Sequence, residues 1–334
     1  MGKLPNLSHR LKTRKCCSVV TFFLIVSAFL SCGFYKESDS SGSSKFRMER
    51  MLPDQDQLEK GRLDVPLISA NLSKLIVARR YPRPGDVDCQ NFTISLFQEN
   101  TFNPVGLVSY PGSGNTWLRH LIEFSTGVFT GSVYMDEDLL AKGFLGEKEA
   151  WDSGSTVVQK LHLKYSPAYK FPSSILLIRE PYPAIISFVH FKESGHLGFA
   201  QVSTLHHKKW PDYVLGQTFN WMSLIISWVK SPSKLHIVHY EKLIADTKNE
   251  LLKICKFLNV PCAYINSACF EKNMDGLFHR KTKIKPPPPA KLEESVLNKI
   301  IAGENYISNL LVRHGHDPLP VELYQYHREV FKSR

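Results

Sequence analysis

Short apolar runs and longer amphipathic stretches alternate along the chain from about Pro104 onward. The apolar runs have the length and composition of buried strands, at Val105–Ser109, Thr156–Gln159, Ile175–Ile178 and Leu235–His239. The longer stretches have helical periodicity, at Thr116–Ser125, Pro183–Lys192, Tyr213–Lys230, Lys248–Leu258 and Lys291–Arg313. This alternation predicts an α/β fold with a central parallel sheet flanked by helices.

A second constraint lies near the N-terminus, where Cys16–Tyr35 runs for 20 residues without a charge. That length suits a transmembrane helix, although a cleaved signal peptide with its cleavage site near Ser31–Gly33 is the alternative. Basic residues precede the segment, so the positive-inside rule predicts a single-pass type II topology. We expect a cytoplasmic tail over residues 1–15, a signal anchor over residues 16–35 and a luminal remainder.

The luminal part divides by composition. Residues 36–103 begin with a Ser-rich polar run and predict a stem, while residues 104–334 form the expected catalytic domain. Sequons at Asn71 and Asn91 agree with a luminal glycoprotein. The four cysteines after the anchor allow two disulfides in three possible pairings, or they remain buried thiols: Cys89, Cys255, Cys262 and Cys269.

The composition narrows the partners without choosing one. At 43% hydrophobic and 22% charged residues, the chain has a globular composition, and its net charge is +11. A basic excess suits an anionic partner such as a nucleotide, an acidic glycan, a membrane surface or nucleic acid. No metal site is expected, because CxxC and HxxxH spacings are missing, and no nucleic-acid motif is present.

A glycine-rich turn, Tyr110-Pro-Gly-Ser-Gly-Asn-Thr-Trp117, falls where the first strand meets its helix. Such a turn lets main-chain N–H groups approach a phosphate, and the following helix adds its positive N-terminus. The GxxxxGK[ST] signature of nucleoside triphosphatases is missing, so ATP or GTP hydrolysis is disfavoured.

Two other motifs follow predicted strands. Arg179-Glu-Pro comes directly after one strand, at the sheet edge where open α/β folds bind ligands, and Ser187 lies further along the next helix. Lys160-Leu-His162 follows another strand, and its histidine could accept a proton from an attacking hydroxyl. Alone, each motif is also typical of ordinary structural residues.

The ordered set YPxSGxTW, KxH, RxPxxxxxS and FxHF resembles the PAPS-dependent sulfotransferases, over roughly residues 105–281. The segments at residues 239–243 and 276–281 are similar to later motifs of that family. YPGSGNTW, LLIREPY and GHLGFA give a closer resemblance to the WSC-domain-containing sulfotransferases, known as sialate O-sulfotransferases. The Cys-rich WSC modules are missing, because only Cys89 precedes the catalytic region on the luminal side, so we expect a short relative.

The resemblance implies a sulfotransferase fold of the P-loop-like type, and it implies roles for individual residues. His162 would be the general base, and Lys160 would neutralise charge on the sulfuryl oxygens. Trp117 would lie against the adenine. The donor's 5′-phosphosulfate would contact Gly112, Ser113, Gly114, Asn115 and Thr116, and its 3′-phosphate would contact Arg179, Ser187, Arg280 and Lys281.

Two alternatives stay open. Many cytosolic relatives have a lysine where Gly112 stands, and we hypothesise that Lys160 or Arg119 replaces that cation. Relatives of the heparan type use a glutamate on the helix after the first loop as the general base. His120 occupies that position here and is the second candidate base.

The expected function is transfer of a sulfuryl group from PAPS to a glycan hydroxyl in the Golgi lumen, with sialylated chains as candidate acceptors. A catalytically weak protein that binds a glycan or nucleotide is the second interpretation, and a nucleotide kinase on the same fold is the third. The oligomeric state, the acceptor hydroxyl and the cysteine pairing do not follow from the sequence.

Overall fold

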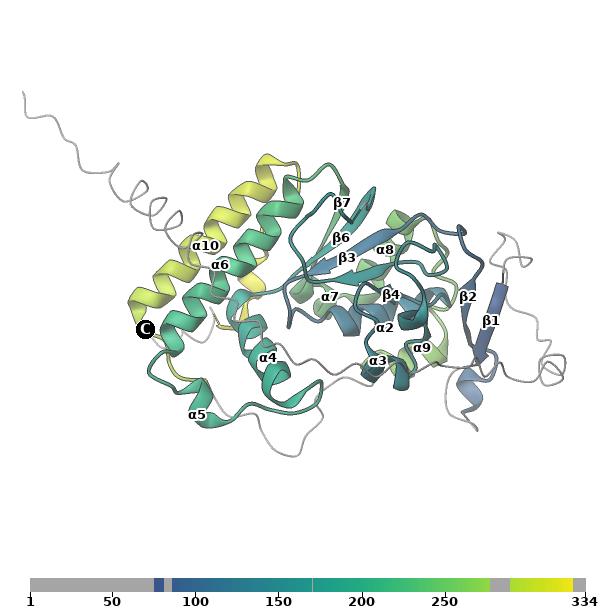
Figure 1. Cartoon of the computed structure of the whole chain (residues 1–334), viewed down its shortest axis with the longest axis horizontal. Coiled ribbons are helices and arrows are strands. Elements are labelled where there is room, and N and C mark those ends of the chain that lie inside the picture. The colour runs from purple at the N-terminus through teal and green to yellow at the C-terminus, as the bar shows by residue number, and fades with distance from the viewer. Residues whose placement is uncertain (1–74, 81–85, 170, 277–288, 327–334) are drawn as a thin grey trace, which may run out of the picture. The chain divides into compact units, whose positions relative to one another are not determined.

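The computed structural model describes the backbone of residues 75–80, together with residues 86–169, 171–276 and 289–326 (Figure 1). The expected tail, anchor and most of the stem lie outside the described residues, as do Arg280 and Lys281. Within the described ranges, no helix combines the length and the apolar character that crossing a membrane requires.

A five-stranded sheet, in the order β4-β5-β3-β6-β7, forms the centre of the fold. All of its neighbouring strands are parallel. The strands are β3 (Val105–Ser109), β4 (Gly131–Ser132), β5 (Gln159–Leu161), β6 (Ser173–Ile178) and β7 (Lys234–His239). The structure therefore confirms the predicted α/β fold with a central parallel sheet.

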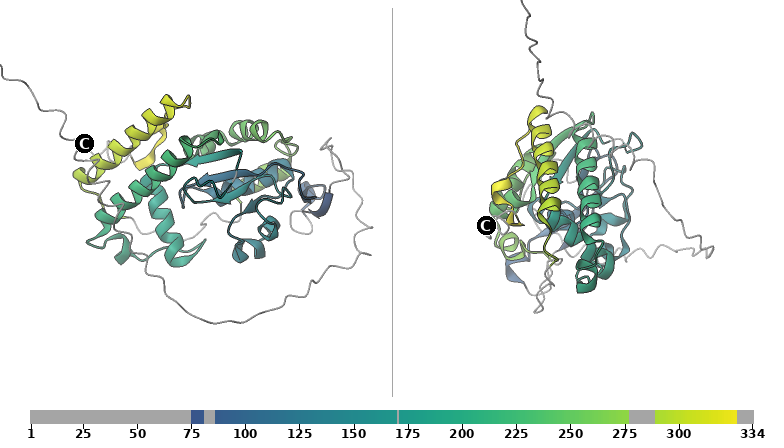
Figure 2. Two further views of the ribbon diagram at one scale, coloured as in Figure 1. Left: turned by 45° about the horizontal axis from the view of Figure 1, so that its top comes forward. Right: turned by 90° about the vertical axis from the view of Figure 1, so that its left-hand side faces the viewer.

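Helices cover both faces of this sheet (Figures 1 and 2). Alternate residues of β6 enter different cores, with Leu176 and Ile178 on one side and Ile175 and Leu177 on the other. One core contains side chains of α4 (Pro181–Ser194), α6 (Trp210–Val229) and α10 (Glu294–Arg313). The other contains side chains of α2 (Asn115–Thr126), α8 (Thr247–Leu258) and α9 (Ala268–Asn273). Burial on both faces explains the continuous apolar runs of the central strands.

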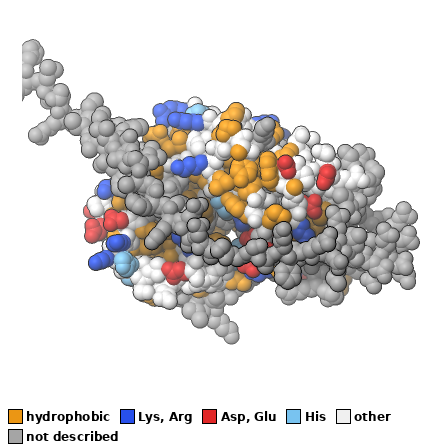
Figure 3. Space-filling model, in the orientation of Figure 1, with side chains coloured by type: hydrophobic (Ala, Val, Ile, Leu, Met, Phe, Trp, Pro, Cys, Tyr) orange, Lys and Arg blue, Asp and Glu red, His pale blue; other side chains and the backbone are white. Residues whose placement is uncertain are grey.

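Shorter elements complete the described part. A separate antiparallel pair joins β1 (Leu75–Arg80) to β2 (Thr93–Phe97). The remaining elements are η4 (Val87–Cys89), α3 (Glu137–Ala141), η5 (Leu145–Lys148), α5 (Val202–Leu205), α7 (Tyr240–Ala245) and η6 (Val321–Leu323). On the face drawn in Figure 3, charged side chains of both signs lie among hydrophobic ones, so this face is not uniformly basic.

Several element bounds differ from the sequence expectation, and two of the differences change the extent of the fold. The expected strand Thr156–Gln159 begins and ends later, because the hydrogen-bonded ladder with β3 pairs Gln159 through Leu161. Residues 86–103 belong to the expected stem, yet Phe92 and Ile94 are buried in the core with α2. The packed part of the chain therefore starts before Pro104, at a strand that the mixed composition of this region concealed.

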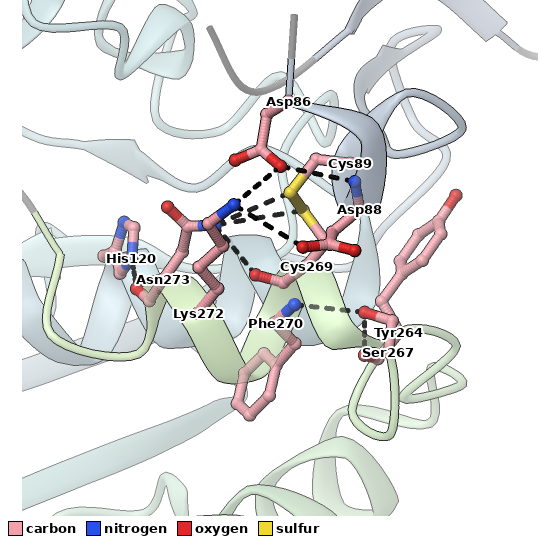
Figure 4. Close-up of a disulfide and its surroundings, with 10 residues drawn as sticks. All are labelled: Asp86, Asp88, Cys89, His120, Tyr264, Ser267, Cys269, Phe270, Lys272 and Asn273. Atoms are coloured by element: carbon pink, nitrogen blue, oxygen red, sulfur yellow. Dashed lines mark hydrogen bonds and ion pairs between the residues drawn. A yellow bond between two sulfur atoms is a disulfide. The ribbon is translucent and has the colours of Figure 1, made fainter.

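Two disulfides select one of the three cysteine pairings. Cys89 pairs with Cys269 across 180 residues, and Cys255 pairs with Cys262 across seven residues. The first bond joins η4 to α9, as Figure 4 shows. It therefore links the segment before β2 to α9, the third helix after the last strand, β7.

Candidate active site

The carboxyl ends of β5, β3, β6 and β7 are adjacent, because these strands are parallel neighbours. The glycine-rich turn follows β3, with the segment after β5 on one side and the segment after β6 on the other. His162 follows β5 and Arg179 follows β6, so strand order alone places a candidate base and a cation on opposite flanks of the turn. This edge is where open α/β sheets bind ligands.

Both glycines of the turn are required by its geometry. Gly112 and Gly114 have φ angles of 82° and 92°, which side-chain-bearing residues rarely adopt. A Cβ atom at Gly112 would collide with the main-chain oxygen of Ala184 and would lie 2.8 Å from the nitrogen of Phe188. A Cβ atom at Gly114 would lie 2.6 Å from the Tyr240 ring. The space that a lysine would need at residue 112 is therefore filled by the backbone of α4.

Ser113, between these glycines, has a fully buried side chain, and its Oγ has no hydrogen-bond partner among the described residues. Helix α2 begins two residues later, without a side-chain cap on its first N–H groups. Orphaned N–H groups and a buried hydroxyl favour an anion at this place. The turn therefore fits a phosphate or sulfate group.

The side chain of Asn115, unlike that of Ser113, is hydrogen-bonded within the protein. Its Nδ2 donates to the main-chain oxygen of Leu107 at 3.0 Å and to Ser109 Oγ at 3.2 Å. The side-chain amide thus clamps the end of β3 to the start of α2. For an anionic ligand, Asn115 retains its main-chain N–H, whereas both side-chain hydrogens already have acceptors. Thr116 is half-buried in the first turn of α2.

His162 is half-buried beside Ser109. Its Nδ1 lies 2.9 Å from the main-chain oxygen of Ser109 and 3.3 Å from Ser109 Oγ. A carbonyl oxygen only accepts hydrogen bonds, so we assign the proton to Nδ1. Burial, followed by the charge of Lys160, lowers the pKa of His162 to about 4. At neutral pH the ring is therefore uncharged, with its lone pair on Nε2.

Tyr134 contacts both members of the KxH pair. Its hydroxyl oxygen accepts the main-chain N–H of His162 at 2.7 Å, and its ring centroid lies 5.9 Å from that of His162. Lys160 Nζ lies 5.8 Å from the Tyr134 ring centroid. Burial, followed by the charge of Arg119, lowers the pKa of Lys160 to about 8. Lys160 thus remains mostly charged at pH 7.

Arg119 belongs to a buried network of hydrogen bonds with Glu147 and Thr130. Its guanidinium donates to Glu147, to Thr130 Oγ1 at 2.7 Å and to the Thr130 main-chain oxygen at 3.1 Å. Glu123 accepts both the main-chain N–H and the hydroxyl of Thr130, and burial raises the pKa of Glu123 to about 7. Because the Arg119 side chain has no exposed surface, the structure does not favour it as the cation missing at Gly112.

Tyr240 packs against the glycine-rich turn on the side of Arg179. The Arg179 guanidinium lies 4.3 Å above its ring centroid, and Arg179 Nη1 donates to the Gly112 oxygen at 2.8 Å. The Trp117 ring meets Tyr240 edge-on with centroids 5.8 Å apart. Trp117 Nε1 also donates to the Met274 oxygen at 2.9 Å. Ser187 is half-buried on α4, the helix that contacts Gly112.

His120 faces α9. Its Nε2 lies 2.7 Å from the main-chain oxygen of Asn273, near the Cys89–Cys269 disulfide (Figure 4). Its ring also packs 4.2 Å from that of Phe124. Since the carbonyl of Asn273 only accepts, His120 Nε2 acts as a donor here. This contact links α2 to α9.

The structure thus brings the sequence-predicted Lys160, His162, Arg179 and the glycine-rich turn to one sheet edge, whereas His120 makes its hydrogen bond with α9. Three further contacts of the site are not among the site residues predicted from the sequence: Ser109, Tyr134 and Tyr240. Ser109 and Tyr240 could have been found from their position at strand ends. Tyr134 carries no such signal, because its contact with His162 depends on the path of the loop after β4.

A model of the sulfotransferase domain family matches residues 103–333 of the chain. A WSCD family member of Aedes aegypti is 38% identical over 184 residues, which are 53% of this chain and 57% of that protein. A WSCD family member of Drosophila pseudoobscura pseudoobscura is 32% identical over 215 residues, covering 63% of this chain and 67% of that protein. Mouse sulfotransferase SULT7A1, solved complexed with PAP, is 17% identical with a TM-score of 0.36, over 64% of this chain and 85% of that chain.

Proposed function

The chain belongs to the sulfotransferase domain family, and from this premise we propose that it transfers a sulfuryl group from PAPS to a hydroxyl group of a glycan. One observation carries the proposal. An uncharged His162, with its lone pair on Nε2, lies beside a glycine-rich turn whose buried Ser113 hydroxyl has no hydrogen-bond partner in the described part of the chain. Sulfuryl transfer to a hydroxyl requires a proton acceptor for the hydroxyl and an anion-binding site for the donor.

The turn and its surroundings would hold the donor. Ser113 Oγ and the N-terminal N–H groups of α2 would bind the 5′-phosphosulfate. Arg179 would hold the 3′-phosphate together with Ser187, Arg280 and Lys281, of which the last two lie outside the described residues. Trp117, fixed through its indole N–H to Met274, would present a face to the adenine. When bound, PAPS supplies the sulfuryl group and a stable leaving group, PAP.

His162 would take the acceptor's proton on Nε2 while the acceptor oxygen forms its bond to sulfur. The bond between sulfur and the bridging phosphate oxygen breaks, and its electron pair leaves with PAP. The Ser109 oxygen, which accepts from Nδ1–H, would stabilise the resulting imidazolium. Lys160 would neutralise charge that develops on the sulfuryl oxygens.

Lys160 remains the candidate for the cation missing at Gly112, since Arg119 is paired with Glu147 inside the core. Arg179 adds a second positive charge near the turn, because its guanidinium already contacts the Gly112 oxygen. His162 is preferred over His120 as the base, because His162 is half-buried at the sheet edge that carries the glycine-rich turn, whereas His120 is buried against α9.

The acceptor and the compartment are further parts of the proposal. We place the protein in the Golgi membrane as a single-pass type II protein, with the apolar segment Cys16–Tyr35 as its anchor. The two disulfides agree with an oxidising lumen. The motif resemblance to the WSC-domain-containing sialate O-sulfotransferases favours a glycan acceptor, with sialylated chains as the first candidates. The region matched in the Aedes aegypti WSCD family member covers 57% of that protein.

The test is transfer of radiolabelled sulfate from PAPS by the purified full chain to a glycan panel that includes sialylated chains. The variants His162→Ala and His120→Ala form a matched pair. Label that His162→Ala loses and His120→Ala retains would support both the reaction and the base. The opposite pattern would make His120 the base, and a protein that does not bind PAPS would refute the donor.

A protein that binds PAPS without turnover is the second candidate, because the lysine that many relatives use is replaced by Gly112. The same assay separates the two functions. Saturable PAP binding with no label on any glycan of the panel would favour the binding protein over the enzyme.

A further inference from the structure

We propose that Asn115 and Ser109 are positioning residues that fix the tautomer of the neutral His162 ring, so that Nε2 is the atom that takes the acceptor's proton. This inference rests on the proposed sulfuryl transfer. It gives the side chain of Asn115 a role in orienting the base, whereas its place in the glycine-rich motif predicted contact with the donor.

The geometry begins at the end of β3. Asn115 Nδ2 has two hydrogens, and both have buried acceptors, the Leu107 main-chain oxygen at 3.0 Å and Ser109 Oγ at 3.2 Å. Asn115 is 4% exposed, and Ser109 is fully buried. The amide therefore holds the last residues of β3 at two points, and the second point is the hydroxyl of Ser109 itself.

Ser109 in turn presents two oxygens to one nitrogen of His162. Nδ1 lies 2.9 Å from its carbonyl oxygen and 3.3 Å from Oγ. If Nδ1 lacked a proton, its lone pair would face the carbonyl lone pairs at the shorter of these distances. With the proton on Nδ1, both oxygens can accept it, and Oγ can also accept from Asn115. The contacts thus favour the Nδ1–H tautomer.

This tautomer matters because the two ring nitrogens have different access. Nδ1 faces the buried end of β3, where a hydroxyl substrate cannot approach, so only Nε2 can serve as the base. A base oriented by a second group is a recurring requirement of nucleophilic activation. Loss of Asn115 would loosen the end of β3, and the carbonyl and hydroxyl of Ser109 would no longer be held together against Nδ1.

The first test needs no acceptor. Nuclear magnetic resonance of 13C,15N-histidine-labelled full chain reports the tautomer of each ring, and the His162 signals are those missing from His162→Ala. We expect Nδ1–H in the wild type and a mixture of tautomers in Asn115→Ala. A wild-type ring protonated at Nε2, or an unchanged tautomer in Asn115→Ala, would overturn the inference.

The second test measures turnover of PAPS with the best glycan of the panel. We expect Asn115→Ala to lower kcat about 10- to 100-fold, as supporting contacts of a functional histidine commonly do. The affinity for PAP should change less than about threefold, because the main-chain N–H of residue 115 remains. Ser109→Thr, which keeps the hydroxyl, should retain more activity than Ser109→Ala.

Two combinations separate orientation of the base from a general structural effect. Because the residues act in series, Asn115→Ala/Ser109→Ala should be little worse than Asn115→Ala. In a His162→Ala background, Asn115→Ala should leave the residual rate unchanged, and a further loss of the same size would refute the inference. Failure of the wild type to bind PAP would refute the proposed function instead, and the tautomer measurement would still decide the positioning role.

Discussion

Arg119 and Glu147 form an ion pair in which neither side chain has any exposed surface. The pair joins α2 to η5, and the second carboxylate oxygen of Glu147 accepts the main-chain N–H of Asp136 at 2.9 Å. Asp136 follows Met135, whose φ of 53° is unusual for a residue with a side chain. The buried pair thus holds the loop that carries Tyr134 to His162.

Breaking this pair should destabilise the fold strongly. Glu147→Ala leaves the Arg119 guanidinium buried without its partner, which costs about 3–5 kcal/mol in free energy of unfolding. The double variant Arg119→Met/Glu147→Leu removes both charges and should lose less. Urea unfolding of each variant measures the difference. Lys248→Ala, which breaks the exposed pair with Glu271, is the control and should cost no more than about 1 kcal/mol.

If Glu147→Ala and Lys248→Ala lost equal stability, the Arg119–Glu147 pair would not be the support of this loop. If the double variant were the least stable of the set, packing rather than charge pairing would explain the effect.

The pH dependence of kcat/KM should report His162 and Lys160 in the free enzyme. His162 must be neutral to accept a proton, and its pKa is lowered to about 4, so activity should rise as the pH increases through that value. Lys160 must be charged, and its pKa is lowered to about 8, so activity should fall above that pH. A broad maximum near pH 6 follows.

The variant Lys160→Arg tests the assignment of the alkaline limb. Arginine stays protonated up to about pH 12, so the fall above about pH 8 should disappear even if the rate is lower. An unchanged alkaline limb in Lys160→Arg would assign that limb to another group.

Gly112 should tolerate no side chain. In Gly112→Ala the new methyl group must displace the backbone of α4 near Ala184, and the alanine must adopt a positive φ. We therefore expect lower stability and weaker PAP binding. Gly216 is the matched control, because it lies within α6, and among the described residues a methyl group added there would meet nothing within 4 Å beyond its chain neighbours and the local helix backbone. Gly216→Ala should raise the free energy of unfolding by about 0.5–1 kcal/mol. Thermal unfolding with and without PAP measures both effects.

Equal behaviour of the two variants would show that α4 can move away from the turn. In that case Gly112→Lys would become a fair test of whether the relatives' lysine can work in this site.

The parallel sheet could be predicted, because strands buried on both faces have continuous apolar sequences, and Arg179 could be placed at its ligand-binding edge; the order of the strands could not. Leu107 and Val108 illustrate the continuous apolar sequence, since they are adjacent in β3 and enter opposite cores. The Tyr134 contact could not be predicted, because the buried Arg119–Glu147 pair sets the path of its loop. The same holds for the burial of Phe92, whose segment reads as a stem until Cys89 is known to pair with Cys269.

The Cys89–Cys269 disulfide should stabilise the protein more than Cys255–Cys262. It closes a loop across 180 residues rather than seven, and the chain-entropy relation gives about 5 kcal/mol for the long loop and about 2.5 kcal/mol for the short one.

The Cys89–Cys269 bond also fixes α9, whose Asn273 binds His120 and whose next residue, Met274, binds Trp117. Cys89→Ser/Cys269→Ser should therefore lose both stability and PAP affinity, whereas Cys255→Ser/Cys262→Ser should lose mainly stability. Denaturant unfolding and PAP calorimetry separate these effects, and equal PAP affinity in the two variants would show that α9 holds Trp117 without the long-range bond.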